Sequence, residues 1–484
     1  MNLKLLSATV FSASLLTACG GGSSSSDTSV INIANAQKVV NTNAAIAYAV
    51  YSDALTTAEA LQTALQTLRT NPTQENLDAA RKAWLVAREP YGQSEAYRFR
   101  NSPIDSSDTD GPEGRMNAWP LGEALIDYVI TGGEFGTDEI GVTDNAVTVG
   151  TANGEGAYPI NADNHSGHNI IEDTTVALNA ALLTDYSSVD SGERDVIAGY
   201  HAIEFLLWGQ DLNNTAAVTD GTDRENAIKA FGATGLASGG QRPLNDFVPG
   251  YGVNTATANA DVAYNSDTLS HRRHKYLELA AAQLVTDLTQ VRDGWAPGAA
   301  YRTAFTTVNN ENDVKEKLGQ ILYAMATLSK GELAGERINV ALQSKQQEDE
   351  HSCFSDNTHR DIWLDAEGIS NSYTGVYAGY DSDLDGVADV TSRAVNGYGL
   401  DDYLADAGLS DLNSRLLDKL STTKTLYQAI DAKARAGKPV DVLIMAKDDD
   451  HLLLGNIVSS LNAQAGVMAE VIETLGATCA VCEE

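Results

Sequence analysis

The sequence from residue 318 to residue 333, LGQILYAMATLSKGEL, decides the fold class. Helical geometry places residues three and four positions apart on the same side. The apolar residues of this stretch therefore form one continuous stripe along a helix, made of Leu318, Ile321, Leu322, Met325, Leu328 and Leu333. Such a stripe predicts an amphipathic helix packed against a core, and we expect this helix to extend over residues 301–342.

The same periodicity predicts helices on both sides of this stretch. They lie near residues 30–69, 73–99, 120–130, 170–183, 195–212, 225–231, 269–291, 402–436 and 451–475. No run alternates for long enough to predict a strand, and the passages 100–160 and 351–400 look irregular. The sequence therefore predicts an all-α fold of two four-helix-bundle-like domains, residues 30–255 and 256–484, with long irregular loops.

Composition excludes several classes of partner. The 484 residues carry 66 Asp and Glu against 32 Lys and Arg, a formal net charge of -34. A surface this acidic repels phosphate backbones, so we expect no nucleic-acid partner, and it favours the gathering of cations. A hydrophobic share of 43% is too high for a disordered chain.

The N-terminus has the pattern of an export signal. Lys4 precedes an apolar run from Leu5 to Leu16, which is shorter than the roughly 20 residues that span a bilayer. A basic start, a short apolar core and small residues before a break are typical of a signal peptide, here residues 1–18.

Residue 19 is the expected point of membrane attachment. The sequence LTAC, ending at Cys19, resembles the bacterial lipobox, in which the cysteine is lipidated; an ordinary signal peptide with a chance cysteine is the alternative. Residues 19–29 form a Gly/Ser-rich tether. We expect a lipid-anchored protein of the cell envelope. By analogy with Gram-negative sorting, Gly20 favours the outer membrane, facing the periplasm or the cell surface.

Three cysteines remain in the exported body: Cys353, Cys479 and Cys482. An oxidising compartment favours a structural disulfide. The bond could form within the C-x-x-C pair or from one of its members to Cys353, and either choice leaves one thiol over.

The densest cluster of residues that could bind a metal or take part in catalysis is GYHAIEFLLWGQD, residues 199–211. On a helix, His201, Glu204, Trp208 and Asp211 share one sector of about 80°. Imidazole and carboxylate at this spacing can share a cation such as iron or zinc. The alternative is a hydrogen-bonded polar pair inside the core.

This run resembles the signature of the imelysin family, insulin-cleaving and iron-regulated envelope proteins whose hallmark is G-x-H-x-x-E. Four further blocks are similar to family blocks: SPID (102–105), GPEGRMNAWPL (111–121), GELAGER (331–337) and EHSCFSDNTH (350–359). The resemblance implies two helical bundles with the motif helix at their interface.

The resemblance also implies a function. We expect a transition metal, with iron favoured and zinc or copper as alternatives, bound by His201 and Glu204 at an inter-domain cleft during iron uptake, with uptake proteins as partners. The candidates for lining this cleft are Arg115, Asp211, Glu336, Arg337, His351 and Ser352. Glu332, Glu336 and Arg337 could equally form a plain salt-bridge row.

Two other functions stay open. The family is classed with metallopeptidases, so a zinc peptidase with Glu204 as its catalytic residue is one alternative. A metallopeptidase needs three protein ligands, an open position and a general base, however, whereas His201 and Glu204 supply at most two ligands. The sequence therefore favours metal handling over hydrolysis. A non-catalytic receptor or scaffold is the other alternative.

A separate acidic loop, DSDLDGVAD at residues 381–389, has the spacing of a calcium site. The expected ligands are the carboxylates of Asp381, Asp383, Asp385 and Asp389 and the carbonyl of Val387. The twelfth position is Ser392 rather than a bidentate glutamate, so this is not a complete EF-hand. An exposed acidic loop without an ion is the alternative.

Overall fold

The computed structural model describes residues 30–106, 111–119, 121–127, 170–171, 176–187, 196–209, 240, 242, 244–249, 266–345, 349–446 and 449–482. Over this part of the chain the fold is all-α, with one two-stranded antiparallel ribbon, β1 (Val376–Tyr377) paired with β2 (Val395–Asn396).

The helices are bounded as follows: α1 Ile33–Thr70, α2 Gln74–Ser94, η1 Glu95–Tyr97, α3 Glu113–Met116, α4 Glu123–Ile126, α5 Ala180–Ser187, α6 Gly199–Trp208, η4 Leu244–Asp246, α8 Ser266–Gly294, α9 Ala300–Thr306, α10 Glu311–Thr327, η5 Leu328–Asn339, α11 Val340–Ser344, α12 Thr358–Thr374, α13 Leu400–Asp406, α14 Ser410–Arg435, α15 Val440–Met445 and α16 Asp449–Leu475.

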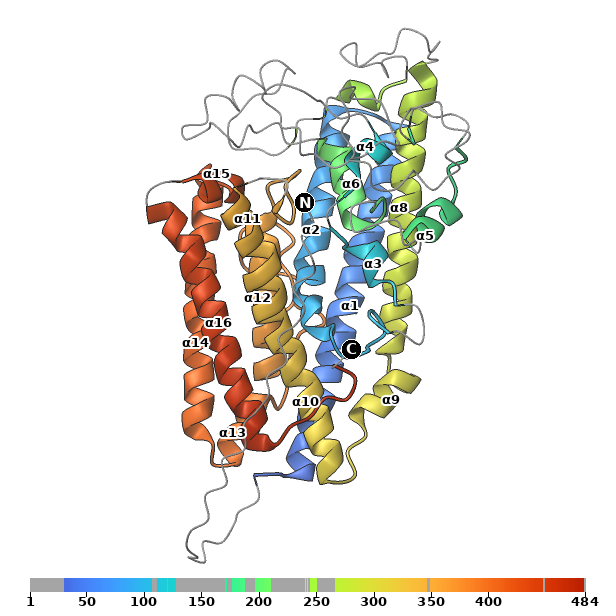
Figure 1. The fold of residues 1–484 in the computed structure, drawn as a ribbon. Helices are drawn as coiled ribbons and strands as arrows, with labels where there is room; N and C mark the ends of the chain where they lie inside the picture. The colour runs from blue at the N-terminus through green and yellow to red at the C-terminus, as the bar shows by residue number, and fades with distance from the viewer. Residues whose placement is uncertain are drawn as a thin grey trace, which may run out of the picture.

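Two groups of long helices lie side by side (Figure 1). In the first group, α1 packs against α2 and α8, and α6 packs against α2 and α8. In the second group, α16 packs against α14, α10 and η5. Helix α12 contacts both α2 and α14, and so joins the two groups. Helix α8 follows residue 255 in sequence, yet it packs on α1 of the first group. The division of the chain into two domains at residue 255 stays a prediction.

Most long helices form where the apolar spacing predicts them. Helix α1 begins after Asn32, whose side chain accepts a hydrogen bond from the backbone N–H of Asn35, and it buries residues such as Val39, Val50 and Leu61. This capping satisfies a donor that the first helical turn leaves without a partner. Helices α2, α8 and α16 likewise follow the predicted ranges.

Three sequence expectations about helices are wrong. Residues 301–342 are not one α-helix: α9 ends at Thr306, Asn310 caps α10, and residues 328–339 are π-helical. The range 402–436 breaks near Gly408, whose φ of +76° suits a glycine. Residues 170–171 form a turn, and α5 begins only at Ala180.

Helix α12 was not predicted, because the passage 351–400 looked irregular. Its buried face combines an apolar row at helical spacing, Ile362, Ala366, Ile369 and Tyr373, with charged residues that include Arg360, Asp361 and Asp365. These side chains are paired with residues far away in sequence. The apolar row is a readable helix signal, but the charged residues between its members make the passage look irregular. The helix expected at residues 225–231 lies outside the described residues.

The C-terminal cysteines pair with each other, as one of the two alternatives predicts. Cys479 and Cys482 form a disulfide, and Cys353 is a buried free thiol. The segment after α16 docks on α10, where the backbone N–H of Thr478 donates to the carbonyl of Lys315. Gly319 makes this contact possible, since a Cβ at residue 319 would lie 1.8 Å from the carbonyl oxygen of Thr478.

We expect Gly319→Ala to lower the free energy of unfolding by about 1–3 kcal/mol, because the added methyl forces the docked tail away from α10. Gly455→Ala is the matched control. It also lies within a long helix, but a Cβ there meets no atom within 4 Å. That substitution should stabilise the protein by up to about 1 kcal/mol. Urea unfolding of both variants checks the difference, and equal stabilities would contradict the docking of the tail.

Candidate functional site

Helix α6 carries His201 and Glu204, and all its residues are buried. It begins at Gly199, whose φ is +79°, and a Cβ there would lie 2.3 Å from the carbonyl oxygen of Met116. Only glycine tolerates both this conformation and this approach. The first residue of the G-x-H-x-x-E motif therefore lets α6 start against the loop that contains Met116.

Glu204 holds His201 in a fixed orientation. Nδ1 of His201 lies 2.9 Å from Oε2 of Glu204. The other carboxylate oxygen, Oε1, accepts hydrogen bonds from the backbone N–H and the hydroxyl of Ser355, at 3.0 and 2.6 Å. When Nδ1 carries the hydrogen and donates it to Glu204, Nε2 of His201 presents a lone pair, and this atom has no hydrogen-bond partner.

Two aromatic rings stand beside the imidazole of His201. The ring of His351 is centred 4.8 Å away, and that of Trp119 is centred 4.9 Å away; both lie edge-on. Nε2 of His351 lies 3.3 Å from the amide nitrogen of Asn117 and 3.5 Å from Nη2 of Arg88. Arginine can only donate, so Nε2 of His351 is an acceptor and its hydrogen sits on Nδ1.

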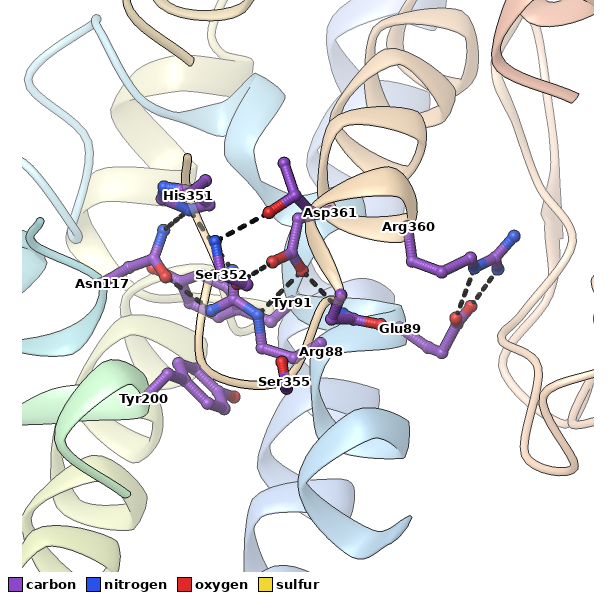
Figure 2. A network of polar contacts seen from close by, with 12 residues as sticks. Arg88, Glu89, Tyr91, Asn117, Tyr200, His351, Ser352, Ser355, Arg360 and Asp361 are labelled. Atoms are coloured by element: carbon purple, nitrogen blue, oxygen red, sulfur yellow. Dashed lines mark hydrogen bonds and ion pairs between the residues drawn. The ribbon is translucent and has the colours of Figure 1, made fainter. Parts of the chain in front are cut away.

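Arg88 of α2 links this pair of histidines to α12. Its Nε donates to Asp361 at 3.0 Å and its Nη1 donates to the side-chain oxygen of Asn117 at 2.5 Å. Asp361 also accepts a short hydrogen bond from the hydroxyl of Ser352. Figure 2 shows Arg88 at the centre of this network, with Tyr200 beside it and the separate pair Glu89–Arg360 further along the two helices. The site is thus assembled from α2, α6, α12 and the loops that contain Asn117 and His351.

Burial keeps both histidines neutral. Burial lowers the pKa of His201 well below its usual value, and the positive charges of Arg88 and Arg337 lower it further. Burial and Arg337 likewise depress the pKa of His351. Burial raises the pKa of Glu204, and the hydrogen bonds from Ser355 oppose that rise. Neutral imidazole is the form that binds a metal ion.

Arg337 belongs to an adjoining buried network. It lies on the π-helical turn η5 and pairs with Asp365 at 2.6 Å, Glu95 at 2.9 Å and Glu332 at 3.3 Å. Glu95 also pairs with Arg98 at 2.6 Å and accepts from Asn117 at 3.4 Å, which connects this network to His351.

The structure brings some of the predicted site residues together and not others. His351 and Ser352 join His201 and Glu204, and Arg337 lies in the adjoining network. The guanidinium of Arg115 pairs instead with Asp287 of α8, and Glu336 is exposed. Asp211 and Cys19 lie outside the described residues. His201 and Glu204 are both 0% exposed, so the site is enclosed rather than open as the expected cleft.

The sequence did not single out Arg88, Asn117, Ser355 or Asp361. One signal for Arg88 is present in the sequence. Trp84, Arg88 and Tyr91 follow the four- and three-residue spacing of one helix face, so a charge falls on a stripe of buried aromatic residues. A charged residue in such a place needs a buried partner.

Sets of three metal-binding atoms within 4.8 Å of one another occur at two places among the residues that the structure describes. One is Glu350, Asp356 and Asp441, all buried, and the other is Asp381, Asp383 and Asp385 of the predicted calcium loop. In that loop Asp389 accepts hydrogen bonds from the backbone N–H and the hydroxyl of Ser382, and Val387 is 66% exposed. Neither set includes His201.

Known proteins with related sequences and folds support the fold described above. The sequence model of the imelysin family matches residues 47–468. Iron-regulated protein A of Synechococcus elongatus is 45% identical over 64 residues, which are 13% of this chain and only 17% of that protein.

Two solved structures resemble the whole fold. A Parabacteroides distasonis protein described as an iron-regulated protein A precursor superposes with a TM-score of 0.54 at 15% identity, covering 91% of this chain and 95% of that one. An imelysin-like protein from Psychrobacter arcticum gives a TM-score of 0.53 at 14% identity, covering 92% of this chain and 97% of that one. At these identities the likeness concerns the fold. The family match extends over most of the sequence and includes the G-x-H-x-x-E helix, and the chain therefore belongs to the imelysin family.

Proposed function

We propose that this chain is a cell-envelope lipoprotein that binds a transition metal, iron in the first place, through His201, and that it acts in iron uptake. The observation that carries the proposal is the free Nε2 of His201 in a buried, neutral imidazole whose other nitrogen is held by a carboxylate. Metal-binding histidines are commonly oriented in this way by a carboxylate on the second ring nitrogen.

The arrangement assigns different roles to the two motif residues. Both oxygens of Glu204 already accept hydrogen bonds, from His201 and Ser355, so Glu204 orients the ligand and His201 binds the metal. His351 becomes a second nitrogen ligand if its ring turns, because its Nε2 now accepts from Arg88 and Asn117.

A site with so few protein ligands suits exchange better than catalysis. A zinc peptidase needs three protein ligands and a general base, and the described residues place no such set around His201. A metal held by one or two imidazoles keeps other coordination positions for water, and the enclosed site would have to open for a carrier to deliver the metal or take it away. The iron-related names of the relatives agree with a metal that is cargo.

Attachment to the membrane completes the proposal. Cys19 would carry the lipid, and residues 19–29 would hold the folded body off the outer membrane. The net charge of -34 would gather cations around it, so that uptake proteins of the envelope are the expected partners rather than nucleic acid.

Metal analysis of the protein purified without added metal tests this function. We expect iron, or copper or zinc in its place, at about one atom per chain. Protein that binds no transition metal at micromolar concentration would contradict the proposal and leave a receptor or scaffold. Cleavage of a protein substrate that is sensitive to a chelator, and is lost in Glu204→Ala, would favour the peptidase instead.

We propose a calcium ion in the loop of residues 381–389 as a separate cofactor. Carboxylate oxygens of Asp381, Asp383 and Asp385 already lie within 4.8 Å of one another. We expect calcium to raise the melting temperature by roughly 2–4 °C, because a bound ion stabilises only the folded chain. Asp383→Asn should abolish that shift. Thermal melts with calcium and with a chelator check this, and identical melting temperatures would exclude the ion.

A further inference from the structure

Arg100, like Arg88, is a fully buried arginine, but it takes no part in the network around His201. It follows η1 and is 1% exposed. Its guanidinium carbon lies 5.0 Å from the ring centre of Tyr97, 5.4 Å from that of Trp295 and 5.3 Å from that of Phe305. The aromatic rings come from η1, the turn after α8, and α9, so this cage joins three separate segments of the chain.

The guanidinium of Arg100 has no carboxylate partner among the residues that the structure describes. Its Nη1 donates to the side-chain oxygen of Asn43 at 3.1 Å, and its Nε reaches the carbonyl of Tyr97 at 3.4 Å. Asp105, in the same loop, directs its oxygens to the backbone N–H groups of Arg100 and Ser102 instead. Elsewhere in the core, by contrast, Arg88, Arg337 and Arg360 each pair with a buried carboxylate. A buried cation is unfavourable without a partner of opposite charge, and no carboxylate among the described residues forms an ion pair with this guanidinium, although the charge of Asp105 lies close enough to act on Tyr301.

Four buried hydrogen-bonding atoms of the cage and of the ring packed against it also lack a partner. They are Nη2 of Arg100, Nε1 of Trp295 and the hydroxyls of Tyr97 and Tyr301. Burial raises the pKa of both tyrosines, so their hydroxyls stay protonated and able to donate. The ring of Tyr301 is centred 4.9 Å from that of Trp295, so it packs directly against the cage.

The chemistry of these atoms defines their occupant. Arg100 and Trp295 can only donate, and the hydroxyls can donate as well, so the occupant must accept several hydrogen bonds. A water molecule would bring two hydrogens that need acceptors of their own, and would leave the guanidinium of Arg100 without an ion pair. A small anion satisfies the donors and the charge together.

We propose that Arg100, Trp295, Tyr97 and Tyr301 form a buried site for a small monoanion of the halide class, such as chloride. The anion occupies a position between the guanidinium and the indole N–H and ties η1 and its following loop to the end of α8 and to α9. It acts on the stability of the first helix group and is independent of metal binding at His201.

Crystals of the full chain grown in sodium bromide test the site directly. We expect an anomalous bromine peak within about 3.5 Å of a guanidinium nitrogen of Arg100 and of Nε1 of Trp295. Electron density that fits only water molecules at this position, without an anomalous peak, would overturn the proposal.

Thermal unfolding provides the second test. At equal ionic strength, chloride or bromide should raise the melting temperature by about 2 °C or more over gluconate, which is too large for the cage. Trp295→Phe keeps an aromatic ring, although a smaller one, but removes the N–H donor, and should at least halve this difference. Tyr427→Phe is the control, because it removes a buried hydroxyl that also lacks a partner but lies on α14. Equal melting temperatures in halide and gluconate, or an equal loss in both variants, would contradict an anion at Arg100.

Discussion

His201→Ala is expected to weaken iron binding by at least about 100-fold, because it removes Nε2 of His201, the imidazole nitrogen that would coordinate the metal. Loss of a residue that merely orients a metal-binding histidine commonly costs 10- to 100-fold in affinity. Glu204→Gln, which keeps the size of the side chain but removes its charge, should therefore weaken binding by about 10- to 100-fold. Titration of the apoprotein with iron measures both effects.

His271→Ala is the matched control for this experiment. His271 lies on α8 and is exposed, so its loss should leave the affinity unchanged. If His201→Ala bound iron as tightly as the unaltered protein, the metal would have to lie elsewhere, and the buried carboxylates Glu350, Asp356 and Asp441 would be the next place to examine.

Arg337→Ala is expected to lower the free energy of unfolding by about 3–5 kcal/mol, since it leaves buried carboxylates without their cation. Arg337 pairs with Glu95 and Asp365, which are both 1% exposed. Arg415→Ala is the control. Arg415 pairs with Glu470 at 2.6 Å, but both side chains are about half exposed, so its loss should cost no more than about 1 kcal/mol. Chemical denaturation of the two variants gives the comparison.

The same variant should change how the protein responds to acid. Burial favours the neutral form of Glu95, but Arg98 and Arg337 outweigh burial and lower its pKa to about 2. A carboxyl whose pKa is lower in the folded state contributes stability above its unfolded pKa of about 4.3, and that stability is lost as the pH falls toward 2. In Arg337→Ala the pKa of Glu95 rises, so less stability is lost over this interval. An unchanged acid profile would contradict the role of this ion pair.

The sequence predicts the helices that pack through apolar faces. It does not predict the buried ion pairs between residues that are far apart in the chain. Helices α1, α2, α8 and α16 present apolar residues at helical spacing, which is a local property. Helix α12 also has apolar residues at helical spacing, but it buries Arg360, Asp361 and Asp365 as well, and no local pattern reveals the partners of these charges. The break before α10 has a readable signal, because Asn310 followed by Glu311 and Asp313 is typical of a capped helix start.

The site divides in the same way. His201 and Glu204 share one helix turn, so their spacing and the family motif both indicate them. Arg88, Asn117 and Asp361 come from three other segments, and their meeting is a product of the tertiary fold. Whether Glu204 is a ligand or orients one depends on Ser355, which is 151 residues away in sequence.

The pairing of α2 with α12 bears on how the polypeptide acquires its fold as it is made. Arg88 and Asp361 are 273 residues apart, so α2 leaves the ribosome long before its partner helix exists. Until α12 is made, the charged groups of α2 remain hydrated and its apolar face is exposed to solvent. Exposed apolar surface of this kind promotes aggregation and the binding of chaperones. Contacts of such long range also close slowly. Because Arg88 in the first third of the chain needs Asp361 as its buried partner, the first third cannot finish folding until the last third has been synthesised.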